Sequence, residues 1–326
     1  MSLKSSAEVI LKRCMALKKY ESFLVVTDKN LLKISRIILE QANYAKSKEL
    51  VEIPVGKVNG EEPSQHVAEI MKKFDVVVIP TTKSLTHTKA REYACKAGTR
   101  IATLPGITES TFNRCIDIDY DKMCALNRQL KKIIDKASLI KITTQKGTDI
   151  SFSIKDRDSF MDSGILTKKG ISGNLPAGEV FIAPVEGTAN GRIIVDASFA
   201  GIGKLKKPIE ISVKDGYATD IKGTNASKIS EWLVKLGKSA RNIAEFGIGT
   251  NDKAKVIGSL LEDEKVKGTA HIALGNNLYF GGNVDVPFHA DGVFQKPTIF
   301  ADGKLLMDNG RFVFESKSQK SSTLKV

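Results

Sequence analysis

The segment Asp75-Val-Val-Val-Ile-Pro80 places four consecutive β-branched residues between a charged residue and a proline. A short, uninterrupted apolar run of this kind is typical of a strand that is buried on both faces, as in a parallel sheet. Similar runs lie on either side of it, at Phe23–Val26, Leu50–Val55 and Arg100–Thr103. The stretches around these runs are amphipathic and predict helices over 5–19, 29–45, 62–73, 87–97 and 119–137. This alternation predicts an N-terminal α/β domain whose parallel sheet is covered on both faces.

The second half of the chain has a different composition. Only four of the 26 glycines precede residue 140. Apolar and polar residues alternate over Leu139–Thr144, Asp149–Ile154 and Gly191–Asp196, as they do in half-buried antiparallel strands. The one clear helical pattern runs from Lys228 to Ala244. We therefore predict an α/β N-terminal domain over 1–137, a glycine-rich, mainly β domain over 138–315, and a polar, disordered tail over 316–326.

Composition excludes several classes of protein. No apolar run approaches about 18 residues, so we expect no transmembrane helix, and the charged N-terminal segment does not resemble a signal peptide. The four cysteines form no C-x-x-C pair, which favours reduced thiols and a cytoplasmic location. The net charge of +13 arises mostly in residues 1–170, but few aromatic residues and no reading motif accompany it. A solvated basic face is therefore expected, and a nucleic-acid partner is not.

Five polar residues in the second half stand in apolar or glycine-rich surroundings. His289 and Asp291 form an H-x-D pair, which in a strand directs both side chains to the same face, and His271 lies in an apolar run. Glu179 and Glu245 also have apolar neighbours and need a cation or hydrogen-bond donors if they are buried. Imidazole and carboxylate together suit a first-row metal. Each residue taken singly also has a structural explanation. Glu179 could cap a helix or turn, Glu245 could pair with a lysine, and His271 could be a hydrogen-bonded core histidine. A lone H-x-D is more often a surface pair.

Five ordered strings carry a family resemblance: NLPAGEVFIAP, NIAEFGIGTN, LEDEKVKGTAHIALGNN, FGG and HADG. Together they resemble the aminopeptidase T/aminopeptidase S family of thermophilic metalloproteases, and within it the short leucyl-aminopeptidase-like members. The resemblance covers most of residues 140–315, and the first half fits the family's α/β N-terminal domain more loosely. It implies two divalent metals held by two glutamates, two histidines, an aspartate and a tyrosine. By motif position the first five ligands are Glu179, Glu245, His271, His289 and Asp291.

Two further roles follow from the resemblance. Glu245 is the expected ligand that bridges the two metals, and Glu264 is the expected general base because the family pattern keeps a glutamate just before this histidine. The tyrosine of the family pattern falls at Leu278, with Tyr279 one residue later.

The leading functional prediction is a metal-dependent aminopeptidase that hydrolyses N-terminal residues from peptides. A two-metal site of zinc, cobalt or manganese would activate water and clamp the reacting groups, and the resemblance also implies a homodimer. The alternative is a mononuclear non-haem Fe(II) dioxygenase that cleaves dihydroxypyridine rings, with His271, His289 and Asp291 as its ligands. Because such an iron site does not need Glu179 and Glu245, their presence favours the peptidase. A non-catalytic binding protein on the same scaffold is the third hypothesis.

Overall fold

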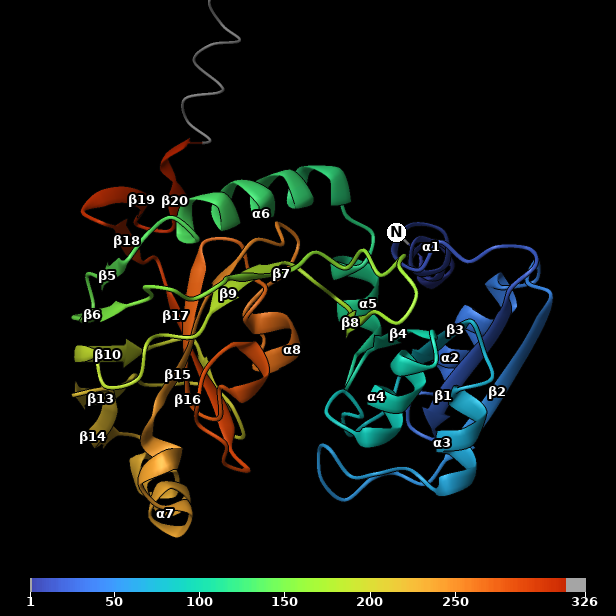
Figure 1. Ribbon diagram of the computed structural model, residues 1–326, viewed down its shortest axis with the longest axis horizontal. Helices are drawn as coiled ribbons and strands as arrows, with labels where there is room; N and C mark the ends of the chain where they lie inside the picture. Colours follow the sequence, from blue (N-terminus) through green and yellow to red (C-terminus); the bar gives the residue numbers. More distant parts are fainter. Residues whose placement is uncertain (1, 315–326) are drawn as a thin grey trace, which may run out of the picture. The chain divides into compact units, whose positions relative to one another are not determined.

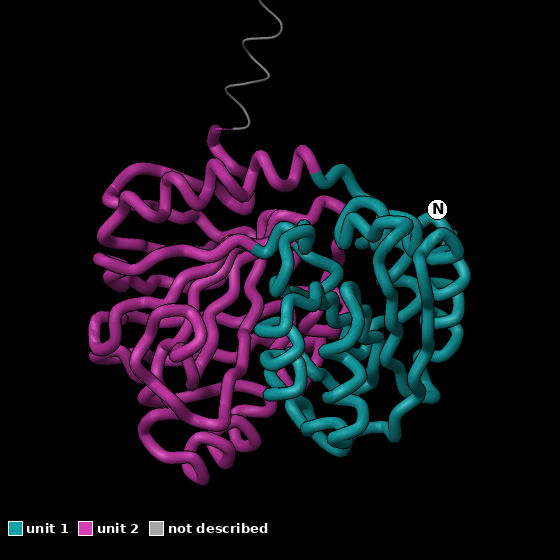
Figure 2. Tube along the Cα trace, turned by 45° about the vertical axis from the view of Figure 1, so that its right-hand side comes forward, with its two compact units in different colours: residues 1–120, 162–177 teal, residues 121–161, 178–326 magenta. Residues whose placement is uncertain are grey.

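A computed structural model describes residues 2–314, which fall into two compact units. The first unit contains the chain up to residue 120 together with residues 162–177, and the second contains residues 121–161 together with the chain from residue 178 onward (Figure 2). The chain therefore passes from the first unit to the second and back before it completes the second. The predicted disordered tail, 316–326, lies outside the described residues.

The first unit contains the predicted parallel sheet, which confirms the α/β class of the N-terminal half (Figure 1). Its strand order is β2-β1-β3-β4-β8, and all four neighbouring pairs are parallel. The strands are β1 (Ser22–Asp28), β2 (Ser47–Ile53), β3 (Val76–Ile79), β4 (Arg100–Thr103) and β8 (Ser172–Asn174). The helices are α1 (Leu3–Val9), continued by a π-helical turn over Ile10–Cys14, α2 (Leu32–Gln41), α3 (Gln65–Met71), α4 (Lys89–Lys96) and α5 (Glu109–Cys115). Strand β8 and helix α5 were not among the predicted elements.

The second unit consists mainly of two antiparallel sheets with a shared core. The eight-stranded sheet has the order β14-β13-β10-β6-β5-β18-β19-β20, with β5 (Leu139–Thr143), β6 (Asp149–Ser153), β10 (Asn190–Val195), β13 (Ile209–Lys214), β14 (Tyr217–Gly223), β18 (Thr298–Ala301), β19 (Lys304–Asp308) and β20 (Arg311–Phe312). The seven-stranded sheet has the order β12-β11-β17-β16-β15-β9-β7, with β7 (Phe160–Asp162), β9 (Glu179–Ile182), β11 (Ser198–Phe199), β12 (Gly203–Lys204), β15 (Ile243–Gly249), β16 (Thr269–Gly275) and β17 (His289–Gln295). Phe152 of one sheet and Phe246 of the other meet in the core with ring centroids 5.5 Å apart. Helix α6 (Tyr120–Ile134) contributes Leu126, Leu130 and Ile134 to the same core.

One predicted helix ends earlier than its apolar pattern suggests. The helix expected over Lys228–Ala244 is α7 (Ala226–Leu236). It stops at Gly237, whose φ of 80° lies in a region that glycine enters without strain. A short 3₁₀ turn, Lys238–Arg241, then leads into β15. Glu245 therefore lies within strand β15 and not directly after a helix. In the part of the chain that the structure describes, no helix is long and apolar enough to cross a membrane.

A buried ion pair in the first unit gives a prediction about acid stability. The Arg100 guanidinium donates to both carboxylate oxygens of Glu21 at 2.8 Å, and the two side chains are only 5% and 9% exposed. Burial by itself raises the pKa of Glu21, but the hydrogen bonds from Arg100 hold this pKa below its ordinary value of 4.5. Because the folded-state pKa is the lower one, the stability contributed by ionised Glu21 is complete above about pH 4.5. It is lost as the pH falls through the folded-state pKa.

We expect Glu21→Gln to cost about 3–5 kcal/mol at neutral pH, because the change leaves a buried guanidinium without its counter-charge. The cost should shrink in acid, where the wild-type carboxylate is protonated as well. Denaturant unfolding of both proteins between neutral and acid pH measures this difference, with the exposed Glu49→Gln as the matched control. An equal loss of stability at every pH would contradict the assignment.

Candidate metal centre

The seven-stranded sheet gathers the predicted site residues on one face. In β15, β16 and β17 the register pairs Gly247 with His271, and Ala273 with both Glu245 and Asp291. Residues that lie directly opposite each other in an antiparallel pair share a face, and alternate residues along each strand share it too. His289, two residues before Asp291, and Glu179, which pairs with Gly249, therefore lie on this face as well. The intervening residues, such as Phe246, Ile248, Ile272 and Ala290, enter the core on the other face.

Small residues on the same face make room for these side chains. A Cβ atom added at Gly247 would lie 2.0 Å from Nε2 of His271, well inside any real contact. The imidazole thus occupies the space that any larger residue at position 247 would need. Ala273 separates Glu245 from Asp291 in the register. The sheet consequently forms a cradle in which large polar side chains lie over small ones.

Two imidazoles and three carboxylates meet in this cradle. Nε2 of His271 is 3.5 Å from Oε1 of Glu245 and 3.5 Å from Oε2 of Glu179. Nε2 of His289 is 3.2 Å from Oε2 of Glu245 and 3.6 Å from Oδ1 of Asp291. Donor atoms of Glu245, His271 and Asp291 all lie within 4.8 Å of one another. Four of the five side chains are buried, and that of His289 is 32% exposed.

The orientation of His289 identifies which of its nitrogen atoms is available to a metal. Its Nδ1–H donates to the carbonyl oxygen of Asn276 at 2.8 Å, since a carbonyl can only accept. In the neutral imidazole, Nε2 then carries the lone pair and faces two carboxylates. Three acceptors this close repel one another unless a proton or a metal ion lies between them. A backbone hydrogen bond to the outer nitrogen is the usual arrangement for a histidine that ligates a metal.

The pKa values show how strongly this site attracts positive charge. Burial by itself lowers the pKa of His271, but the hydrogen bond and charge of Glu245, with the charges of two further carboxylates, raise it to about 9. The pKa of His289 is also raised, mainly by Asp291 and Glu245, which outweigh the opposing effect of desolvation. Burial opposes ionisation of Glu245, but the two imidazoles hold its pKa far below its ordinary value. Without a metal, protons on the histidines supply the missing charge, and a divalent ion would displace them.

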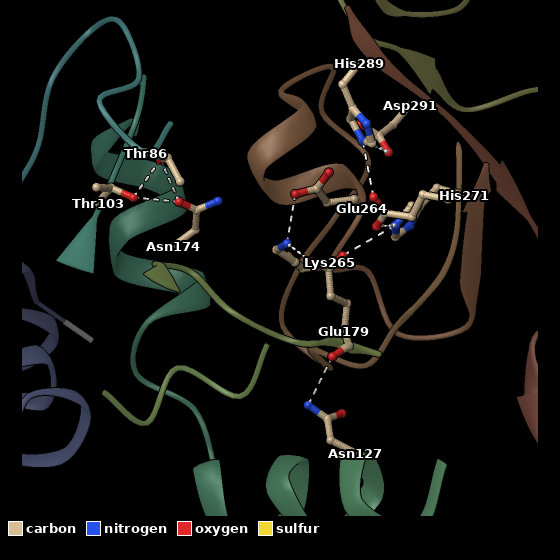
Figure 3. A network of polar contacts seen from close by, with 11 residues as sticks. Thr86, Thr103, Asn127, Asn174, Glu179, Glu264, Lys265, His271, His289 and Asp291 are labelled. Atoms are coloured by element: carbon tan, nitrogen blue, oxygen red, sulfur yellow. Dashed lines mark hydrogen bonds and ion pairs between the residues drawn. The ribbon is translucent and has the colours of Figure 1, made fainter. Parts of the chain in front are cut away.

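A buried lysine, which the sequence analysis did not single out, completes the charge pattern. Lys265 follows helix α8 (Leu260–Asp263), and its side chain is 1% exposed. Its Nζ lies 2.5 Å from Oε1 of Glu179 and 2.8 Å from Oε1 of Glu264 (Figure 3). Burial raises the pKa of Glu264, and the neighbouring ammonium partly offsets this. A single sequence offers no signal that distinguishes this lysine from an exposed one, because its neighbours in LEDEKVKG are polar.

The structure thus brings Glu179, Glu245, His271, His289 and Asp291 together. Glu264 forms an ion pair with Lys265. Leu278 and Tyr279, at the position of the expected tyrosine ligand, are 47% and 71% exposed. The donors present, two imidazoles with carboxylates, fit a single divalent transition metal.

The contact between Gly247 and His271 yields a direct test of the cradle. In Gly247→Ala the new methyl group must displace the imidazole, so we expect metal affinity to fall by about 10–100-fold, the range seen when a group that orients a metal ligand is lost. Metal titration and thermal unfolding measure the effect. Gly56→Ala is the matched control, because it lies in the first unit and its methyl group would meet only side-chain atoms, those of Lys83 at 3.2 Å and of Glu61 at 3.5 Å. Unaltered metal binding in Gly247→Ala would show that His271 does not ligate the metal.

Comparison with known proteins separates the two enzyme hypotheses. The family model for 2,5-dihydroxypyridine 5,6-dioxygenase matches residues 30–314. The 2,5-dihydroxypyridine 5,6-dioxygenase of Pseudomonas putida is 22% identical over 263 residues, which cover 76% of this chain and 74% of that protein. The solved structure of the 2,5-dihydroxypyridine dioxygenase from Pseudomonas putida KT2440 superimposes with a TM-score of 0.81 at 19% identity, covering 95% and 96% of the two chains. AmpT from Thermus thermophilus superimposes with a TM-score of 0.76 at 15% identity, covering 95% and 98%.

These matches overturn the prediction of a metallo-aminopeptidase. The resemblance to aminopeptidase T is correct for the fold, since AmpT shares it. The prediction of a hydrolase that acts on peptides is wrong, because the family model and the curated relative both name a dioxygenase. The five strings led to the correct fold but not to the correct chemistry. The chain belongs to the 2,5-dihydroxypyridine 5,6-dioxygenase family.

Proposed function

We propose that this protein is an iron(II)-dependent dioxygenase that opens the ring of a dihydroxylated pyridine or a closely related aromatic compound. The observation that carries the proposal is the convergence of His271, His289 and Asp291 on one face of the sheet, in a chain of the dioxygenase family. Two imidazoles and one carboxylate are the ligand set of non-haem iron oxygenases, which leave other coordination positions open. Both atoms of dioxygen enter the product as a ring carbon–carbon bond breaks, so the reaction needs no further reductant.

Each residue of the set has a distinct part in this proposal. Nε2 of His289, Nε2 of His271 and a carboxylate oxygen of Asp291 would hold the metal. Bound iron(II) would supply the one-electron chemistry through which dioxygen reacts with an aromatic ring. Glu245 stays ionised and faces Nε2 of both imidazoles, at 3.5 Å and 3.2 Å, so its charge would orient the two rings.

Aromatic side chains beside the exposed histidine suit a flat substrate. The ring of Phe280 lies edge-on to the imidazole of His289, with centroids 5.8 Å apart. Phe181 and then Phe160 continue this row, with centroid separations of 5.8 Å and 5.6 Å. Because His289 is the most exposed ligand, a ring approaching the metal from its side would meet Phe280. Aromatic rings in such contacts gain about 0.5–1.5 kcal/mol beyond the area they bury.

The proposed activity is tested by loading the protein with Fe(II) without oxygen and then adding air-saturated buffer with 2,5-dihydroxypyridine. We expect oxygen uptake and loss of the aromatic absorbance in equal molar amounts. Asp291→Asn, which keeps the size of the side chain but removes its charge, should bind iron weakly and consume no oxygen. An iron-loaded wild-type protein that leaves both oxygen and 2,5-dihydroxypyridine unchanged would refute this substrate class.

A second test concerns the aromatic row. We expect Phe280→Leu to raise KM for the dihydroxypyridine by up to roughly tenfold, the equivalent of one lost aromatic contact, while the iron content stays the same. Phe160→Leu, at the far end of the row, is the control and should leave KM unchanged. Steady-state oxygen uptake with both variants measures the difference. Equal KM values for Phe280→Leu and the wild type would show that Phe280 does not contact the substrate.

A further inference from the structure

Lys265 is buried, whereas most lysine side chains in proteins are exposed to solvent. Its side chain is 1% exposed, and its ammonium stands between the carboxylates of Glu179 and Glu264 at 2.5 Å and 2.8 Å (Figure 3). A buried ammonium needs close counter-charges, and these two contacts provide them. These two contacts therefore hold the ammonium of Lys265 in place as a fixed positive charge beside Glu179 and Glu264.

Glu179 connects this lysine to the metal centre. One of its oxygens, Oε1, contacts the ammonium, and the other, Oε2, lies 3.5 Å from Nε2 of His271. Glu245 approaches the same imidazole nitrogen, also at 3.5 Å. The ammonium of Lys265 and Nε2 of His271 thus face different oxygens of a single carboxylate. A carboxylate that bridges two metal ions likewise offers one oxygen to each.

The charges in this region support the same interpretation. Four carboxylates lie around Lys265 and the two histidines, and their side chains are at most 15% exposed: those of Glu179, Glu245, Glu264 and Asp291. Two divalent ions would neutralise four such charges. One divalent ion together with Lys265 supplies three, so a second divalent ion beside the lysine would leave an excess of buried positive charge.

We infer that the ammonium of Lys265 takes the place of a second metal ion and limits the centre to one. This inference rests on the proposed metal centre and deepens it, because it assigns Glu179 to the lysine rather than to a metal. Two-metal hydrolytic sites hold both reacting groups between ions about 3.5–4 Å apart. A centre with one metal and a fixed ammonium lacks that clamp and keeps open coordination positions for other ligands.

The test is the number of Mn²⁺ ions bound per chain, because Mn²⁺ suits carboxylate and imidazole donors and is visible by electron paramagnetic resonance. We expect one Mn²⁺ in the wild type and two in Lys265→Met, with the spectrum of a magnetically coupled pair. Lys253→Met removes an exposed lysine and should still bind one. A Lys265→Met protein that folds and binds one Mn²⁺ with unchanged affinity, or none, overturns the inference.

Glu179→Gln tests whether Glu179 serves Lys265 rather than a metal ion. This test does not depend on folding of the Lys265→Met variant. It leaves Lys265 paired with Glu264 and should still bind one Mn²⁺, with affinity within about tenfold of the wild type. Loss of the ion would show that Glu179 is a metal ligand and would overturn the inference. These counts are independent of oxygen uptake. A protein that binds one Mn²⁺ as described but does not oxidise dihydroxypyridine when loaded with iron keeps this inference and loses the proposed function.

Discussion

The organisation of the second unit depends on a concentration of negative charge on one face of a β-sheet. Glu179, Glu245 and Asp291 are each less than 8% exposed, and burying ionised carboxylates is costly unless cations meet them. Lys265 meets one of them, and the imidazoles of His271 and His289 meet the others. The carboxylates raise the pKa of both histidines, so the site favours positive charge. It is therefore poised for a cation.

The sheet can hold this charge because its two faces are built differently. Phe246 and Ile272 enter a core shared with the eight-stranded sheet, which supplies the apolar burial that stabilises the unit. Their neighbours along the strands are either ligand candidates or very small residues. Gly247 shows the constraint most clearly, because the imidazole of His271 fills the volume of its absent side chain. Rigid antiparallel strands thus fix the positions of the polar groups before any metal binds.

The sequence predicted the parts of this structure that rest on local pattern. The run Val76–Ile79 identified a buried parallel strand, and the strings around His271 and Asp291 identified residues that the fold brings together. Strand β8 was not predictable, because Ser172–Asn174 is too short and too polar to show a strand period, and it joins its sheet only through the tertiary fold. The burial of Lys265 was likewise invisible, since burial of a charged side chain depends on partners far away in the chain.

The functional prediction failed for a related reason. A fold does not determine an activity, and the five strings led to the fold rather than to the chemistry. The presence of Glu179 and Glu245 favours a second metal, but the ion pair of Glu179 with Lys265 shows that the protein itself can neutralise an acidic residue of this site. On our inference, the number of cations among these carboxylates separates hydrolysis from oxygen chemistry on this scaffold. A single lysine can change the number of metal ions without a change of fold. The residue that indicates the chemistry is then Lys265, which pairs with Glu179, and not Glu179 itself.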